Sequence, residues 1–171
     1  MPEELSFTTR FLGETTFSGA QNRQVETGRS AFEGAAAALE TFYHGFNTRT
    51  LEVLRQNWLD APQAQLNNPV GGIKRGLTEV MDVYARIFAG SACVRVEFYD
   101  IVAYTSSAMA VFAGRERGTY ERDGNVYPLD IRTTRIFAYT PEQGGWRQVH
   151  HHGSIDSAER LAHYVQTALG S

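Results

Sequence analysis

Hydrophobic and polar positions alternate with two different periods along the chain, and the period changes near residue 91. Before that point an apolar side chain recurs every three to four residues, the spacing that places these side chains on one face of a helix. They do so in three stretches, Phe32 to Phe46, Leu51 to Trp58 and Leu77 to Phe88. Pro62 and Gly90 set the latest ends of the second and third stretches. The pattern predicts three amphipathic helices, the first over about 30–47.

Beyond residue 91 apolar and polar residues alternate, which is the period of a β-strand with two different faces. The alternation predicts four long strands, at about 92–104, 108–121, 126–140 and 145–155. Turn-forming residues at Ser106-Ser107, at Asp123-Gly124 and from Pro141 to Gly145 separate them as hairpins. A last helix begins at Asp156 or Ser157. Helices followed by an antiparallel meander predict an α+β fold with the helices on one face of a curved sheet.

The first 29 residues do not share this order. They are rich in Thr, Ser, Gly, Gln and Glu, and Phe7, Phe11 and Phe17 have no steady period. We expect 1–29 to form an arm that is partly disordered or laid across another surface. Residues 30–171 are then one domain, long enough for a real core and an internal pocket.

Charge and composition exclude several classes of function. The net charge is -3 and the 16 basic residues are scattered singly, so no basic stripe predicts a nucleic-acid partner. The acidic start has no apolar run behind it, and no stretch approaches the ~20 apolar residues that cross a bilayer. Cys93 is the only cysteine, so no internal disulfide can form. We therefore expect a cytoplasmic protein without a membrane partner.

The order of elements resembles the nuclear transport factor 2-like superfamily. A short extended piece at 63–68 leads into Asn68-Pro69-Val70-Gly71-Gly72, and the strand segments 134–137 and 145–154 add further likeness. Within the superfamily the chain is most similar to the SnoaL-like polyketide cyclases and the association domain of calcium/calmodulin-dependent kinase II, over about residues 30–155. The resemblance implies a cone-shaped curved antiparallel sheet, three N-terminal helices on its concave face and a C-terminal helix. It also implies a homodimer through the outer sheet face, and neither a cofactor nor a metal.

Ketosteroid isomerases belong to the same superfamily, but their chemistry needs a carboxylate base together with a tyrosine and a protonated aspartate as donors. Matching through the Asn-Pro turn places Asn68, Phe42 and Thr134 at these three positions. Asn68 is not a base, Phe42 donates nothing and Thr134 is a weak donor. Tyr43, one residue from Phe42, is the only partial substitute, so the isomerase mechanism is disfavoured.

Two arginines lie in line with apolar strand residues, Arg115 on the second strand and Arg135 on the third. An unpaired buried charge is costly, so each must be paired or must line a solvated cavity. Kinase association domains carry pocket arginines on these two strands, although their third arginine corresponds to Gly153. The functional interpretation is an anion site built from Arg115 and Arg135. The alternative is an ordinary surface network in which the arginines pair with Glu97, Glu116, Asp130 or a partner subunit.

Three consecutive histidines, His150 to His152, lie on the fourth strand, where neighbouring side chains point to opposite faces. If Val149 faces the helices, His151 looks into the cavity near Arg135 and can act as a donor or a base. A core histidine with its hydrogen bonds satisfied is the alternative. His150 and His152 then lie on the outer face, where two imidazoles alone do not make a metal site.

Large apolar side chains complete the predicted pocket, with Trp58 and Tyr84 in its lining beside Tyr43 and Asn68. We expect a SnoaL-like protein that binds a small anionic or partly aromatic molecule in this pocket. Any chemistry would be isomerisation, cyclisation or hydration, with His151 as the catalytic residue.

The alternative is a non-catalytic association module with a vestigial or regulatory pocket. It predicts a large apolar outer sheet face built from Ala110, Phe112, Ile136 and Ala138.

Overall fold

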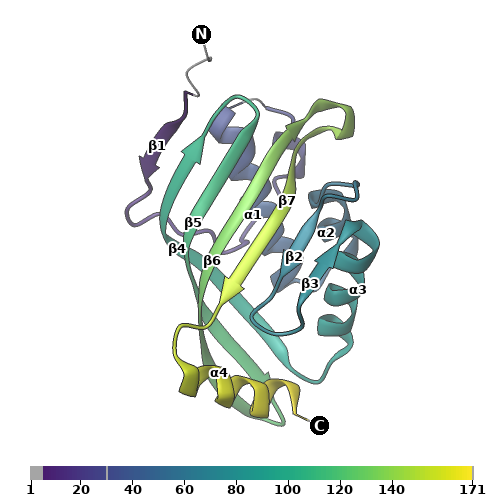
Figure 1. Ribbon diagram of the computed structural model, residues 1–171, viewed down its shortest axis with the longest axis vertical. Helices are drawn as coiled ribbons and strands as arrows, with labels where there is room; N and C mark the ends of the chain where they lie inside the picture. Colours follow the sequence, from purple (N-terminus) through teal and green to yellow (C-terminus); the bar gives the residue numbers. More distant parts are fainter. Residues whose placement is uncertain (1–5, 30, 171) are drawn as a thin grey trace.

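A curved sheet of seven strands organises the chain, in the order β1-β4-β5-β6-β7-β2-β3 (Figure 1). The structure is a computed structural model that describes residues 6–29 and 31–170. The strands are β1 (Thr8–Phe11), β2 (Gln65–Asn67), β3 (Ile73–Arg75), β4 (Cys93–Thr105), β5 (Met109–Arg122), β6 (Asn125–Thr140) and β7 (Gly145–Ser154). Neighbouring strands are antiparallel, except that β2 runs parallel to β7.

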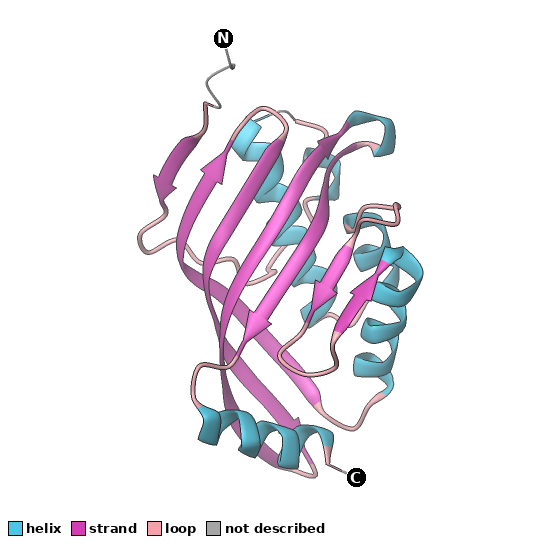
Figure 2. Cartoon of the chain, in the orientation of Figure 1, coloured by secondary structure: helices cyan, strands magenta, loops and turns pink. Residues whose placement is uncertain are grey.

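Three helices cover one face of this sheet, as Figure 2 shows. They are α1 (Ala31–Asn47), α2 (Leu51–Asn57) and α3 (Gly76–Ala89). A fourth helix, α4 (Ala158–Tyr164), continues as a π-helical turn over Val165–Leu169 and lies at the far end of the sheet beside the β5–β6 turn. The α+β cone with three helices on its concave face is confirmed. Each predicted boundary of the four long strands lies within one residue of the observed one.

The N-terminal segment adds the edge strand β1, which pairs with β4 from Thr8↔Thr105 to Phe11↔Val102. Further along, the backbone of Phe17 exchanges two hydrogen bonds of 2.9 Å with Phe98. The Phe17 side chain is buried in the core. Residues 8–17 therefore lie along the β4 side of the sheet.

Strand β7 contains a bulge that changes which of its residues face the helices. Ile136 pairs with His150 and Phe137 with Gln148, so Val149 is an extra residue without a partner on β6. A bulge of this kind shifts the alternation of side chains by one. Gln148 and His151 are consequently both buried on the helix side, whereas strict alternation would place them on opposite faces.

The hairpin of β2 and β3 extends the sheet beyond β7 and was not predicted as a pair of strands. Each has only three residues, too few to show a period. Its pairing creates one row across the sheet, in which Lys74 lies opposite Leu66, Leu66 beside His151, and His151 opposite Arg135. We call these four residues the cross-sheet row. All four line the same cavity.

Candidate functional site

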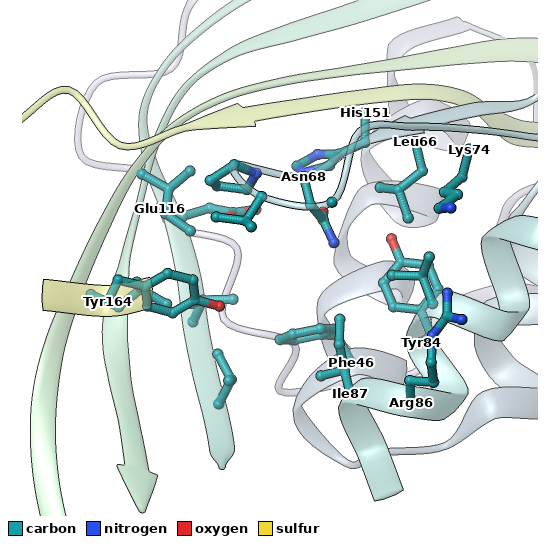
Figure 3. Close-up of a pocket in the computed structure, with 18 of the residues that line it drawn as sticks. Phe46, Leu66, Asn68, Lys74, Tyr84, Arg86, Ile87, Glu116, His151 and Tyr164 are labelled. Carbon is teal, nitrogen blue, oxygen red and sulfur yellow. The ribbon is translucent and has the colours of Figure 1, made fainter. Parts of the chain in front are cut away.

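A cavity of about 400 Å³ lies between α1, α3 and the inner face of the sheet. The loop of residues 68–72 forms one part of its wall, and Tyr164 and Leu169 of the C-terminal segment form another (Figure 3). Most of the wall is apolar, with contributions from Phe42, Phe46, Leu66, Val83, Ile87 and Ile131. A concave, mainly apolar space with a few polar groups is the usual form of a small-molecule site.

A buried polar network forms one side of this cavity, built from Tyr43, Glu116, Arg135 and Gln148. Arg135 Nη2 donates to Glu116 Oε1 at 2.8 Å, and its Nε donates to the Tyr43 hydroxyl at 2.9 Å. Arg135 Nη1 donates to Gln148 Oε1 at 2.9 Å. The Tyr43 hydroxyl in turn donates to Glu116 Oε1 at 2.5 Å. Arg135 and Glu116 are only 3% and 4% exposed, so the pair is almost fully desolvated.

The register of β5 against β6 brings this network together. Phe112 pairs with Arg135 and Glu116 with Ile131, so odd positions of β6 share a face with even positions of β5. The Arg135 guanidinium also lies 3.7 Å from the centre of the Phe42 ring, a cation–π contact from helix α1. The charge is therefore held by a carboxylate, two neutral acceptors and an aromatic face.

The same environment fixes the protonation states of the cavity. Burial raises the pKa of Tyr43 well above its ordinary value of 10.0 and that of Tyr84 to about 12. Burial alone would lower the pKa of Arg135, but the oxygens of Tyr43, Glu116 and Tyr84 raise it above its ordinary value. At neutral pH both phenols are therefore protonated donors, and Arg135 is charged.

His151 lies on β7 directly opposite Arg135 and is 4% exposed. Burial, followed by the positive charge of Arg135, lowers its pKa well below the ordinary value. The ring is therefore neutral at pH 7, and its Nδ1 is buried without a hydrogen-bond partner in the described part of the chain. A Cβ at Gly153 would lie 3.1 Å from His151 Nε2, so the absence of a side chain there makes room for the ring.

Arg115 does not join this site, and the predicted convergence of Arg115 and Arg135 is wrong. Arg115 pairs with Arg132 across the β5–β6 hairpin and faces the outer side of the sheet. Its side chain is 43% exposed and lies 3.5 Å from Asp100 and 3.9 Å from Asp156. The prediction treated odd positions on both strands as one face, whereas the register pairs odd with even.

The same register corrects the predicted outer face. Ala110 and Phe112 are fully buried against the helices. Ile136 and Ala138 are half-buried on the opposite side, where Val111 pairs with Ile136. His150 and His152 also lie there, with ring centres 6.5 Å apart. Among residues 6–29 and 31–170, no three His, Cys, Asp or Glu side chains are grouped as metal ligands.

The other predicted residues divide between the cavity and the core behind it. Asn68 and Tyr84 line the cavity, and Figure 3 shows both side chains turned toward it. Trp58 is buried beside Tyr84, with ring centres 6.3 Å apart, and Tyr43 reaches the site only through its hydrogen bonds. Both support the wall rather than form its surface.

Sequence reasoning assigned none of four polar residues to the site, although it named Glu116 as one possible partner of the arginines. Glu116 and Gln148 complete the network around Arg135, while Lys74 and Arg86 lie at the cavity rim. Glu116 had a usable signal, because it continues the even-numbered apolar series of its strand. Gln148 had none, because the bulge at Val149 decides its face.

Comparison with known proteins identifies the family of the chain. A family model described as a SnoaL-like domain matches residues 35–157. The chain belongs to the SnoaL-like family. The predicted resemblance to the nuclear transport factor 2-like superfamily is thereby confirmed, while no curated protein matches this SnoaL-like sequence.

Solved structures share the fold of this SnoaL-like protein at low sequence identity. A proposed dehydratase of the nuclear transport factor 2-like family from Streptomyces avermitilis is 23% identical, with a TM-score of 0.65 over 72% of this chain and 94% of its own. A ketosteroid isomerase-like protein from Erwinia carotovora atroseptica is 20% identical, with a TM-score of 0.61 over 72% and 94%. A proposed kinase II association domain from Xanthomonas campestris is 14% identical, with a TM-score of 0.64 over 87% and 98%. These likenesses establish the architecture. No helix in the described ranges is both long and apolar enough to cross a bilayer.

Proposed function

We propose that this SnoaL-like protein binds a small molecule with an apolar, partly aromatic body in the cavity between its helices and sheet. The single observation that carries the proposal is the cavity of about 400 Å³ whose apolar wall is interrupted by Glu116, Arg135 and His151. A core needs no such space, since protein interiors are close-packed. Polar groups that converge on an apolar cavity orient a ligand by its own polar atoms.

The polar groups suit proton transfer of the isomerase, cyclase or hydratase type. Neutral His151 can accept a proton at one ring nitrogen and donate from the other. Glu116 adds a carboxylate to the cavity wall, and Tyr84 adds a phenol donor. The dehydratase and isomerase-like names of two structural relatives are consistent with this class.

The network does not favour an anion deep in the cavity. Glu116 already compensates the charge of Arg135, and Arg115 lies on the other face of the sheet. The part of the ligand that reaches His151 is therefore uncharged, such as a carbonyl or a hydroxyl.

The alternative function is an association module in which the cone serves to dimerise. One observation favours it: within the described part of the chain, no helix covers the outer face of β4 to β7 (Figure 1). Val111, Ala113, Ile136 and Ala138 are half-buried apolar residues of that face. A homodimer in the cytoplasm is compatible with either function.

Fluorescence titration with N-phenylnaphthylamine, a neutral aromatic probe that brightens in apolar surroundings, tests the pocket. We expect saturable binding to the wild type and at least tenfold weaker binding to Ile87→Trp, which fills the cavity wall. Val25→Trp is the control, because Val25 is 95% exposed and lies away from the cavity. Equal binding to all three proteins, or no saturable binding to the wild type, contradicts the proposal.

A further inference from the structure

Two cationic side chains share one side of the cavity rim, Lys74 from β3 and Arg86 from α3. Figure 3 shows their charged ends turned toward one another beside the Tyr84 ring. Lys74 is half-buried, whereas Arg86 is exposed. Two like charges from different elements therefore line the same largely apolar cavity.

Neither cation is neutralised by the described part of the protein. No ion pair there involves Lys74 or Arg86. The neighbouring carboxylate of Glu79 accepts from the backbone N–H of Arg75 at 3.0 Å. Asp82 is exposed on the same helix as Arg86 and forms no ion pair with it within 4.0 Å.

The contrast with Arg135 decides where a negative charge can bind. Arg135 directs its guanidinium at Glu116, Tyr43 and Gln148, and an anion placed beside it would also face the Glu116 carboxylate. At the rim an anion meets two cations and no paired carboxylate. A cleft with charge of one sign and low-dielectric walls concentrates ligands of the opposite sign.

We infer that the ligand is an amphipathic acid: a ring-containing apolar body that enters the cavity, with one anionic group held at the rim between Lys74 and Arg86. This inference rests on the proposed function and adds the charge and the orientation of the ligand. The anionic end faces outward, and the opposite end, uncharged, lies against His151. Lys74 and Arg86 are binding residues in this scheme.

A matched pair of probes isolates the contribution of the anion. Anilinonaphthalene sulfonate and N-phenylnaphthylamine share the same ring system and differ in the sulfonate group. We expect the wild type to bind the sulfonate about fivefold to tenfold more tightly, the size expected of two partly solvated ion pairs. Naphthoate should likewise displace the bound probe at lower concentration than naphthamide.

Charge-neutralising variants test the two residues directly. In Lys74→Gln/Arg86→Gln the preference for the sulfonate should disappear, while affinity for the neutral probe stays within twofold of wild type. Each single variant should lose about half of the preference on a logarithmic scale. Arg55→Gln is the matched control, because Arg55 is an exposed arginine of α2 that is not part of the wall of this cavity.

The outcomes separate the two proposals. If the neutral probe binds and Ile87→Trp blocks it, but the double variant keeps the full preference for the sulfonate, the rim inference is overturned and the pocket stands. A wild type that binds both probes equally overturns the rim inference in the same way. If neither probe binds in a manner that Ile87→Trp blocks, the proposed function itself fails. Unchanged melting temperatures in the variants show that each result reports binding rather than folding.

Discussion

The most unusual residue in the molecule is Arg135, a charged side chain that is 3% exposed. Removing an ion from water costs several kcal/mol unless its hydrogen bonds and charge are met inside the protein. Each of its three donating nitrogens has a partner, and Glu116 supplies the opposite charge. The pair is therefore stable as a unit, and each member depends on the other.

That dependence gives the first prediction. Glu116→Leu or Arg135→Met alone leaves one buried charge uncompensated and should lower the free energy of unfolding by about 3–5 kcal/mol. The double variant removes both charges and should lose far less than the two singles together. Urea denaturation of the four proteins measures the coupling. Strict additivity would show that the two side chains are not a buried pair.

His151 gives a second prediction, in the pH dependence of stability. Because its pKa is well below the ordinary value in the folded protein, the unfolded chain binds a proton first as the pH falls. The stabilisation is complete above about pH 6.5 and is lost below it, by up to about 1.4 kcal/mol per pH unit. Between pH 7.5 and 5.5, His151→Gln should lose about 1 kcal/mol less than wild type on urea denaturation.

The control for this prediction is His150→Gln. Burial also lowers the pKa of His150, but less strongly than that of His151. The His150 variant should therefore keep most of the wild-type pH dependence. A His151 variant with the full wild-type dependence would mean that another group titrates.

At the scale of elements, periodicity predicted whether each segment forms a helix or a strand. The register between strands determines which side chains lie next to one another. The helices α1 and α3 and the four long strands could be predicted because each carries its own apolar repeat over ten residues or more. The shorter helix α2 could be predicted because Pro62 sets its latest end. Arg115 and Arg135 lie on well-predicted strands, yet their faces depend on how β5 aligns with β6. One residue of offset moved Arg115 outside and brought Glu116 to Arg135.

The bulge at Val149 limited prediction in a second way. The cavity side could be predicted for His151, because its face follows from Val149 and the helices. Strict alternation places Gln148 on the outer face with His150 and His152, because nothing in the residue types of β7 shows where an extra residue interrupts the pairing. Strand β2 lies within the extended piece predicted at 63–68, but β3 and its pairing with β2 were not predicted, because three residues show no period. The position of Lys74 at the cavity rim was missed with them.

At the scale of the whole molecule, the two faces of the sheet differ in what covers them. Helices α1, α2 and α3 cover the concave face (Figure 2). Val111 and Ile136 pair with each other and lie half-buried on the other face. A half-buried apolar face of this kind suits contact with a second copy.

We therefore predict a homodimer that depends on this outer face. Sedimentation equilibrium should give twice the monomer mass for the wild type and for the control Val25→Lys. Val111→Lys places a charge in the middle of the contact, where burying it is costly, and should shift the equilibrium to monomer at least tenfold. A wild type that stays monomeric at high micromolar concentration, or a Val111→Lys dimer of unchanged strength, would exclude this interface.

The cross-sheet row has a further consequence, because strand spacing is nearly constant. Adjacent strands lie about 4.8 Å apart, so the backbones of Lys74 and His151, two strands apart in the row, are separated by roughly 10 Å. The spacing of hydrogen-bonded strands therefore sets the distance between Lys74 and His151. In the proposed complex, an acid held at Lys74 must span about this distance to reach His151, so that we expect acids of the same charge to differ in affinity with their length.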